Sequence, residues 1–338
     1  MTRLQFLLRR FREHPARLPQ FLMRAVRGQL FPRYKQRDVT LFVGSDGLPL
    51  GDNLLLTAVA REIKKRNADA RITIITNRPE IFERNPDIDH VKLLSEAGKT
   101  ELRTNLISYK HGFPYRKHFL QYCCECVNIT DAIELRTYIH PAAEDWAWAK
   151  AFVSQFSVPP ILISRGAGSQ AYRKTWPLDA WKKIVAHLAR FAPVVEVGAG
   201  AEPLGLSEDQ CLCLSGKTTV HQLAALMKKS QALIAMDSGP MHLAAAVDLP
   251  TVCLLGGVYP PIAVSYPNFR ILSNRPPCAD CAPLRQCDFG TQCLANIKVQ
   301  DVLAALDALC PGISANSSAS KTSRRPRSSD FCHPSSVR

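Results

Sequence analysis

The chain has 338 residues, 46% of them hydrophobic and 21% charged, a composition typical of a globular α/β protein. Because this length exceeds what one hydrophobic core usually supports, we expect two domains. The absence of an apolar run of about 18 residues argues against a transmembrane helix. The N-terminus is basic but has no apolar segment before a small-residue cleavage site, so we expect no signal peptide.

The net charge of +14 is concentrated at the two ends of the chain. Residues 1–37 hold ten Arg or Lys and one acid, and residues 311–338 hold five basic residues and one acid, which leaves about +1 for the rest. A nucleic-acid-binding protein would carry its basic patch on a folded face. We therefore expect no nucleic-acid partner.

The basic segment 1–37 has an apolar stripe at helical spacing that includes Leu4, Leu8 and Phe11. A cationic amphipathic helix of this kind is suited to lie on an anionic membrane surface. Alternatively, its stripe packs on the folded body. The opposite end, residues 311–338, is rich in Ser, Arg and Pro and is predicted to be a disordered basic tail.

The body begins with strand, glycine-containing loop, helix and strand: Asp38–Val43 and Arg71–Thr76 are the two apolar strands. This order is typical of the first crossover of a doubly wound sheet. The loop is not GxGxxG, so a nicotinamide dinucleotide is not indicated. Asp52 lies in the first turn of the helix, where it could act as a general base or could simply favour the helix dipole.

After Pro159-Pro160 the alternation of strands and helices starts again, with an apolar strand at residues 161–164. The loop behind that strand contains Gly166, Gly168 and Ser169, which would let a phosphate approach the backbone, and Lys174 could neutralise it. The alternative is an ordinary loop with a solvated lysine.

Residues 233–257 read as strand, tight turn, helix and strand, with strands too apolar to be solvated on either face. The turn holds Asp237, Ser238 and Gly239 and is followed by a proline that suits a first helical turn. A helix N-terminus at this position offers unpaired N–H groups to an anion, most often a phosphate. Alternatively, the Asp or Ser only caps the helix and His242 only packs.

Twelve cysteines are present, and without an export signal most should be reduced thiols. Four of them fall in one turn-rich segment: Cys278, Cys281, Cys287 and Cys293. The first pair has metal-ligand spacing, and four thiolates would complete a tetrahedral zinc site. The alternative is a packed loop with unliganded thiols.

Taken together, Gly51-Asp52, the Lys-Thr-Trp-Pro element from Lys174 and the stretch DSGPMHLAAA from Asp237 resemble glycosyltransferase family 9, typified by bacterial ADP-heptose:lipopolysaccharide heptosyltransferases. The resemblance implies a GT-B fold, with two Rossmann-like doubly wound domains facing across a cleft. Residues 38–157 would be the acceptor domain and residues 158–310 the nucleotide-sugar domain.

The resemblance also implies roles for individual residues in an inverting transfer that needs neither a metal nor a cofactor. Asp52 matches the general base, and Lys174 matches the lysine that contacts the donor diphosphate. Asp237 would meet the donor sugar. Ser238–Gly239 would offer backbone N–H groups to the pyrophosphate, with His242 just behind them.

The leading hypothesis is a glycosyltransferase that moves heptose from ADP-heptose onto a lipopolysaccharide core or a related cell-envelope glycan. It would work in the cytoplasm as a peripheral protein on the inner face of the membrane, where the basic N-terminal helix would meet a lipid-linked acceptor. The alternatives are a non-catalytic nucleotide-binding scaffold, and a sugar-nucleotide epimerase or hydrolase of the same fold.

Overall fold

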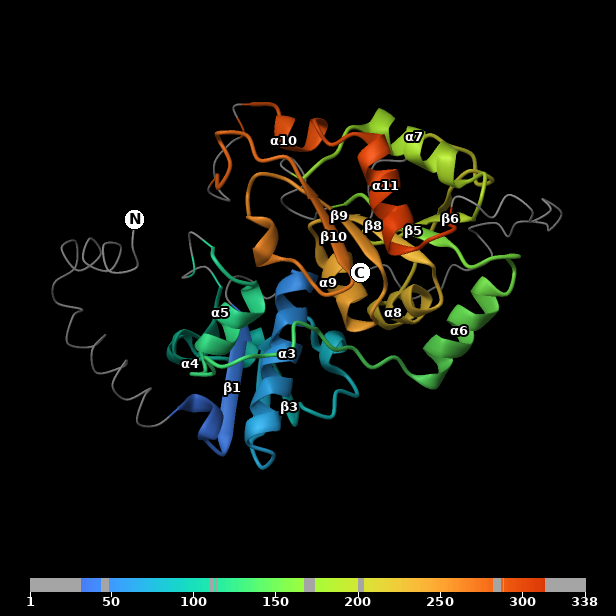
Figure 1. Ribbon diagram of the computed structural model, residues 1–338. Coiled ribbons are helices and arrows are strands. Elements are labelled where there is room, and N and C mark those ends of the chain that lie inside the picture. Colours follow the sequence, from blue (N-terminus) through green and yellow to red (C-terminus); the bar gives the residue numbers. More distant parts are fainter. Residues whose placement is uncertain are drawn as a thin grey trace.

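The computed structural model describes residues 32–43, 49–109, 112, 115–166, 174–199, 204–281, 287 and 289–313. Its strands form two sheets, and every strand pair in both sheets is parallel. The strands are β1 Asp38–Val43, β2 Arg71–Thr76, β3 His90–Leu93, β4 Leu106–Ile107, β5 Ile161–Ser164, β6 Val194–Glu196, β7 Leu212–Cys213, β8 Ala232–Met236, β9 Thr251–Leu255 and β10 Phe269–Ser273. The predicted α/β class with two parallel sheets is confirmed (Figure 1).

The first sheet has the order β3-β2-β1-β4, and helix α3, Leu50–Arg66, connects β1 to β2. The helix begins directly after Pro49, whose ring restricts φ and ends the preceding loop. Two shorter helices complete this part, α4 Lys99–Thr104 and α5 Phe119–Glu125. Asp52 lies in the first turn of α3, as its position after the glycine loop predicts.

The second sheet has the order β10-β9-β8-β5-β6-β7. The first strand of this half, β5, lies in the middle: the chain builds the sheet outward from it through β6 and β7, then returns to the other side of β5 with β8, β9 and β10. This is the strand order of a dinucleotide-binding doubly wound sheet, and the order reverses between β5 and β8. The helices of this part are α7 Leu178–Leu188, α8 Val220–Lys228, α9 Gly239–Ala246, α10 Gln292–Ala295 and α11 Val299–Leu309. In such sheets, ligands bind outside the carboxyl ends of the strands at the point of reversal.

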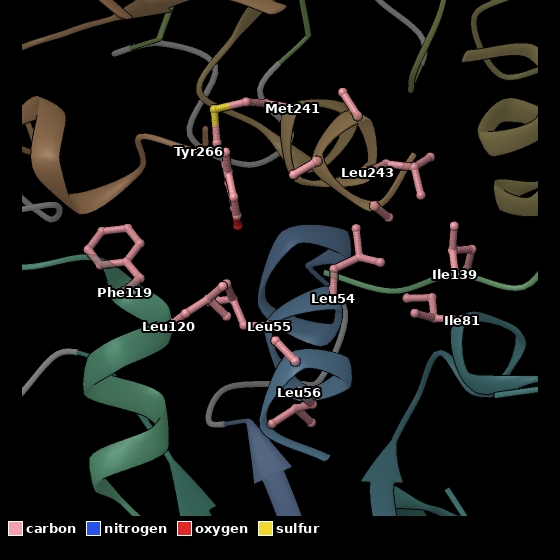
Figure 2. Close-up of a cluster of buried hydrophobic side chains, with 14 of the residues drawn as sticks. Leu54, Leu55, Leu56, Ile81, Phe119, Leu120, Ile139, Met241, Leu243 and Tyr266 are labelled. Atoms are coloured by element: carbon pink, nitrogen blue, oxygen red, sulfur yellow. The ribbon is translucent and has the colours of Figure 1, made fainter. Parts of the chain in front are cut away.

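The two sheets are joined through helices, because α3 packs against α9 (Figure 1). Figure 2 shows the side chains of α3 between Leu120 of α5 and Leu243 of α9, and one cluster of buried apolar side chains includes all three helices. A hydrogen bond joins the halves too, since the Thr137 hydroxyl donates to the backbone carbonyl of His242 at 2.6 Å. One cluster of buried apolar side chains therefore spans both halves, and a second cluster lies within the second half alone.

Helix α6, Ala143–Val153, lies in the predicted acceptor domain but packs against α8 of the second half. The boundary between residues 157 and 158 thus separates two halves that remain in contact through several helices. It stays a prediction, as do the domain assignments on each side of it.

The predicted amphipathic helix falls, apart from residues 32–37, outside the described residues, and so does the predicted tail from residue 314 on. Residues 32–37 are tied to the body by Arg33, whose guanidinium donates to the carbonyls of Thr40 at 2.9 Å and Cys126 at 3.2 Å. Among the helices that the structure describes, none combines the length and the apolar character needed to cross a membrane.

Candidate functional site

The N-terminus of α9 lies at the point where the order of the second sheet reverses. Strand β8 ends at Met236, the chain turns through Asp237 and Ser238, and α9 starts at Gly239 with a proline in its first turn. The Ser238 hydroxyl donates to the Met236 carbonyl at 3.1 Å and makes no capping hydrogen bond. The first N–H groups of α9 therefore receive no cap from this side chain, which leaves them suited to bind an anion.

Lys174 is held directly beside this turn. Its Nζ lies 2.7 Å from Oδ2 of Asp237 and donates to the Asp237 carbonyl at 3.0 Å. It also lies 5.5 Å from the centre of the Tyr259 ring, a cation–π distance. Only 14% of the lysine side chain and 7% of the aspartate side chain are exposed, so this lysine is not the solvated loop residue of the alternative interpretation.

Trp176 explains how Lys174 is placed. Its indole is buried, donates from Nε1 to the carbonyl of Ile297 at 3.0 Å, and meets Trp181 edge to face with 5.1 Å between ring centres. Pro177 follows and directly precedes the first residue of α7. The tryptophan and proline thus anchor the segment while the lysine side chain reaches the α9 turn, a role that motif spacing alone did not assign to them.

Asp52 is partly buried at the start of α3 and accepts a hydrogen bond from the Tyr109 hydroxyl at 3.2 Å. The turn that carries it is rigid, because buried Asn53 donates to the carbonyl of Pro49 at 2.9 Å and accepts from Thr76 at 2.7 Å. These contacts attach the first turn of α3 to the end of β2. The carboxylate is therefore set at the carboxyl edge of the first sheet.

Two tyrosines lie between this carboxylate and the α9 turn. Burial raises the pKa of Tyr109 well above its ordinary value, and the negative charges of Asp52 and Asp237 add to the rise. Burial also raises the pKa of Tyr259, with the same two carboxylates contributing. Both phenols therefore stay protonated at neutral pH. The two rings also pack on the same side chain, that of Phe119, so Asp52 beside Tyr109 and Lys174 beside Tyr259 border one cluster of aromatic side chains.

His242 lies behind the turn, inside α9, and is 6% exposed. Its Nδ1 lies 2.8 Å from the Tyr266 hydroxyl, and burial lowers its pKa to about 4, so the ring is neutral at physiological pH. Its ring packs directly on Gly51. This geometry agrees with the alternative that His242 packs, while its contact with a donor stays a prediction.

The predicted phosphate loop after β5 is described only in part. Gly166 is placed, and a Cβ atom there would lie 3.3 Å from the Ala199 carbonyl, whereas Gly168 and Ser169 lie outside the described residues. Next to it, Arg165 forms a buried ion pair with Glu196 at 2.7 Å. Burial raises the pKa of Glu196, and the guanidinium opposes this rise. The pair was missed by sequence reasoning, although both charges follow or end strands that are otherwise apolar.

All cysteines among the described residues are free thiols, including the four of the predicted zinc site. Across the described ranges, no three His, Cys, Asp or Glu side chains are grouped as metal ligands would be. Residues 282–286 and 288, within the cysteine segment, lie outside those ranges. A metal at Cys278, Cys281, Cys287 and Cys293 therefore stays a prediction.

Comparisons with known proteins agree with this architecture. The model of glycosyltransferase family 9 (heptosyltransferase) matches residues 106–270. Lipopolysaccharide heptosyltransferase 3 of Escherichia coli is 32% identical over 333 aligned positions, which cover 77% of this chain and 96% of that protein.

Among solved structures, E. coli ADP-heptose lipopolysaccharide heptosyltransferase II superposes with a TM-score of 0.61 at 18% identity, covering 80% of this chain and 98% of the other. The dodecameric, iron-containing heptosyltransferase TibC in complex with ADP-D-β-D-heptose gives a TM-score of 0.59 at 17% identity, covering 81% and 76%. These likenesses confirm the predicted GT-B fold. The extent of the sequence match shows that the chain belongs to glycosyltransferase family 9, a family of glycosyltransferases.

Proposed function

We propose that this chain transfers heptose from ADP-heptose to a lipopolysaccharide core or a related cell-envelope glycan. The similarity to a lipopolysaccharide heptosyltransferase along 96% of that relative supports the reaction, and the complex of TibC with ADP-D-β-D-heptose supports the donor. One observation carries the proposal. Asp52 of the first half accepts a hydrogen bond from Tyr109, the Lys174–Asp237 pair of the second half lies beside Tyr259, and both tyrosine rings pack on Phe119.

In the proposed reaction the donor diphosphate lies at the N-terminus of α9. The backbone N–H groups of Ser238 and Gly239 and the ammonium group of Lys174 stabilise the negative charge that develops as the bond from sugar to phosphate breaks. Asp237 holds the lysine at 2.7 Å and is positioned to meet the sugar. The loop with Gly166, Gly168 and Ser169 lets the phosphates approach the backbone.

Asp52 acts as the general base. It takes the proton of the acceptor hydroxyl while that oxygen forms a bond to the anomeric carbon from the face opposite the leaving diphosphate. The bond from the anomeric carbon to the phosphate oxygen breaks, and its electron pair leaves with the nucleoside diphosphate. A single displacement of this kind inverts the anomeric configuration.

The ammonium group of Lys174 and the N-terminal dipole of α9 supply positive charge for the leaving group, so we propose a metal-independent transfer. Activity that survives EDTA supports this point, and activity that is lost with EDTA and restored by Mg²⁺ contradicts it.

We also propose that residues 1–37 hold the protein on the anionic inner face of the cytoplasmic membrane. Deletion of residues 1–31 should then abolish binding to anionic vesicles and spare transfer to a soluble acceptor.

The central test is transfer from ADP-heptose by Asp52→Asn and Lys174→Ala variants. The loss of a general base costs about 10²–10⁴ in rate, so Asp52→Asn should lose transfer while ADP still raises the melting temperature. Lys174→Ala should weaken that thermal stabilisation. Asp179→Asn is the matched control, because Asp179 lies exposed in the first turn of α7, where its charge favours the helix dipole. Lys183→Ala, exposed on the same helix, is the control for the lysine.

The result also separates the alternatives. If Asp52→Asn transfers sugar like the parent, the carboxylate only favours the helix dipole and the proposed mechanism is wrong. A donor that is consumed without an acceptor points to an epimerase or hydrolase. A donor that binds and is never consumed points to a scaffold.

A further inference from the structure

An extended segment, residues 131–142, leads from the first half of the chain to α6 and forms neither helix nor strand. It is hydrogen-bonded both to α3, which carries Asp52, and to α9, whose N-terminus is the candidate anion site. Figure 2 shows Ile139 of this segment between Ile81 of the first half and Leu243 of α9. The segment is therefore in contact with both halves of the site.

Two consecutive residues of the segment bond to the two different helices. The Thr137 hydroxyl donates to the backbone carbonyl of His242 in α9 at 2.6 Å. The N–H of Tyr138 donates to the hydroxyl of Thr57 in α3 at 2.9 Å, and that hydroxyl in turn donates to the carbonyl of Leu54 at 2.6 Å. Because successive residues of an extended chain point to opposite sides, one short stretch reaches both helices.

Both of these bonds are buried. Thr137 and Thr57 are each 0% exposed, and His242 is 6% exposed. A buried hydroxyl that loses its acceptor finds no water in its place, so it keeps its full desolvation cost. A displacement of α9 along α3 would therefore leave the Thr137 hydroxyl unpaired, and the native bond opposes such a displacement.

Neighbouring residues of the segment bond to the same two helices. The Arg136 guanidinium donates to the carbonyl of Ala246, the last residue of α9, at 3.1 Å, and lies 2.8 Å from the carboxylate of Asp248. A cation at this end of a helix also favours the helix dipole. The N–H of Glu134 donates to the carboxylate of Glu62 in α3 at 3.3 Å. Each helix is thus held at two points along its length.

The bonded points lie close to the functional ends of the two helices. Leu54 is two positions after Asp52, and His242 is three positions after Gly239, where α9 begins. Both separations are shorter than one helical turn, over which the backbone is rigid. A shift at Thr137 would therefore move Asp52 relative to the N-terminus of α9 by a similar amount.

We propose that Thr137 is a positioning residue for the transfer: its bond to α9, together with the bond of Tyr138 to α3, sets the distance between Asp52 and a donor held at the N-terminus of α9. This inference rests on the proposed function, since it takes Asp52 as the base and the start of α9 as the diphosphate site. It adds that the segment connecting the two halves also aligns them. Because the acceptor oxygen must attack in line with the breaking bond, even a small misplacement lowers the rate.

The test compares Thr137→Val and Thr137→Ser in the full chain. Valine replaces the hydroxyl with a methyl group of similar shape, so we expect kcat to fall about ten-fold through misalignment. The KM values for donor and acceptor should stay nearly unchanged, because each substrate binds to its own half. The rise in melting temperature caused by ADP should also stay as in the parent. Thr137→Ser keeps the hydroxyl and should retain most of the parental kcat.

Thr251→Val is the matched control. Thr251 is also 0% exposed, and its hydroxyl also donates to a backbone carbonyl, that of Leu249 at 2.8 Å, but this bond lies within the second half alone. Its loss should lower the melting temperature about as much as Thr137→Val does, because the same kind of buried bond is removed. It should leave kcat unchanged. The pair of variants thus separates a loss of stability from a loss of alignment.

The outcomes distinguish this inference from the proposed function. If Thr137→Val keeps the parental kcat and loses only stability, as Thr251→Val should, the positioning role is wrong and the proposed function stands. A fall in kcat accompanied by a raised donor KM or a lost response to ADP would place Thr137 in donor binding and contradict the inference. A Thr137→Ser variant as slow as Thr137→Val would show that the hydroxyl is not responsible. If Asp52→Asn is fully active, the proposed function itself is wrong and the inference falls with it.

Discussion

The imidazole ring of His242 occupies the space that a Cβ atom on Gly51 would fill. Such an atom would lie 3.3 Å from Nε2 of the histidine and only 2.7 Å from Cδ2, and this second distance is closer than real Cβ atoms approach other atoms. Gly51 directly precedes Asp52, and His242 lies in the helix whose N-terminus is the candidate anion site. A second glycine repeats the arrangement, because a Cβ on Gly239 would lie 2.7 Å from the Cβ of Leu50. The starts of α3 and α9 thus fit together only because each offers a residue without a side chain.

Gly51→Ala should disturb this fit. The new methyl group forces α3 and His242 apart, which overpacks a buried site, so we expect the free energy of unfolding to fall by about 1–3 kcal/mol. Transfer activity should fall as well, since Asp52 moves with the helix. Urea unfolding and steady-state kinetics measure the two effects.

Gly98→Ala is the control for this substitution. A Cβ atom at Gly98 meets nothing within 4 Å, and its φ of −75° is open to any residue. It should leave both unfolding and transfer unchanged. A Gly51→Ala variant that behaved in the same way would show that the contact with His242 has no energetic consequence.

Trp176→Phe should weaken both stability and donor binding. The carbonyl of Ile297 loses its 3.0 Å donor inside the core, at a cost of about 1–3 kcal/mol in the free energy of unfolding. Because Lys174 is only two residues away, its ammonium group becomes less well placed, and the thermal stabilisation by ADP should shrink. Trp148→Phe, a half-buried tryptophan of α6, should leave the effect of ADP unchanged. Equal stabilisation of Trp176→Phe and the parent would contradict the anchoring role.

The buried pair of Arg165 and Glu196 should be coupled strongly. The two side chains are 7% and 5% exposed, so removing one partner leaves an uncompensated buried charge, at a cost of about 3–5 kcal/mol in the free energy of unfolding. Arg165→Met and Glu196→Leu should each be that destabilising, whereas the double variant should lose less than either single one. Chemical unfolding of all four proteins gives the coupling energy. Additive effects would mean that the pair is not coupled in solution.

Stability should fall as the solution is acidified below neutral pH. Burial lowers the pKa of His118 to about 3 and that of His242 to about 4, from an ordinary value of 6.5. Between the unfolded pKa of 6.5 and the lower folded pKa, the unfolded chain binds a proton at each histidine that the folded chain does not. The stabilisation is therefore complete above pH 6.5 and is lost as the pH falls to about 4 for His242 and about 3 for His118. Each histidine can contribute a slope of up to about 1.4 kcal/mol per pH unit.

His118→Asn isolates one of these contributions. Asparagine can still accept the hydrogen bond from the N–H of Leu120 that caps α5, but it does not titrate. The dependence of the melting temperature on pH should therefore flatten between pH 6.5 and about 3. An unchanged slope would show that His118 is not the buried neutral group described here.

Several features of the molecule follow directly from its sequence. The apolar runs 161–164, 232–236 and 251–255 are strands buried along their whole length, because parallel strands are covered on both faces and need no alternation of polar residues. The turn at Asp237 and the start of α9 follow from the small and proline residues there. The motifs around Asp52, Lys174 and Asp237 also identified the family, which the relatives then confirmed.

The assembly of the site was decided by the tertiary structure alone. The bond from Tyr109 to Asp52 joins residues 57 positions apart, and that from Lys174 to the Asp237 backbone joins residues 63 apart. The fit of Gly51 against His242, and the reversal of strand order between β5 and β8, likewise depend on how distant segments pack. Hydrophobic periodicity reports which side of a helix or strand is buried, because that depends on neighbours along the chain. It carries no information on which distant side chain lies opposite, since that is set when the two sheets close around α3 and α9.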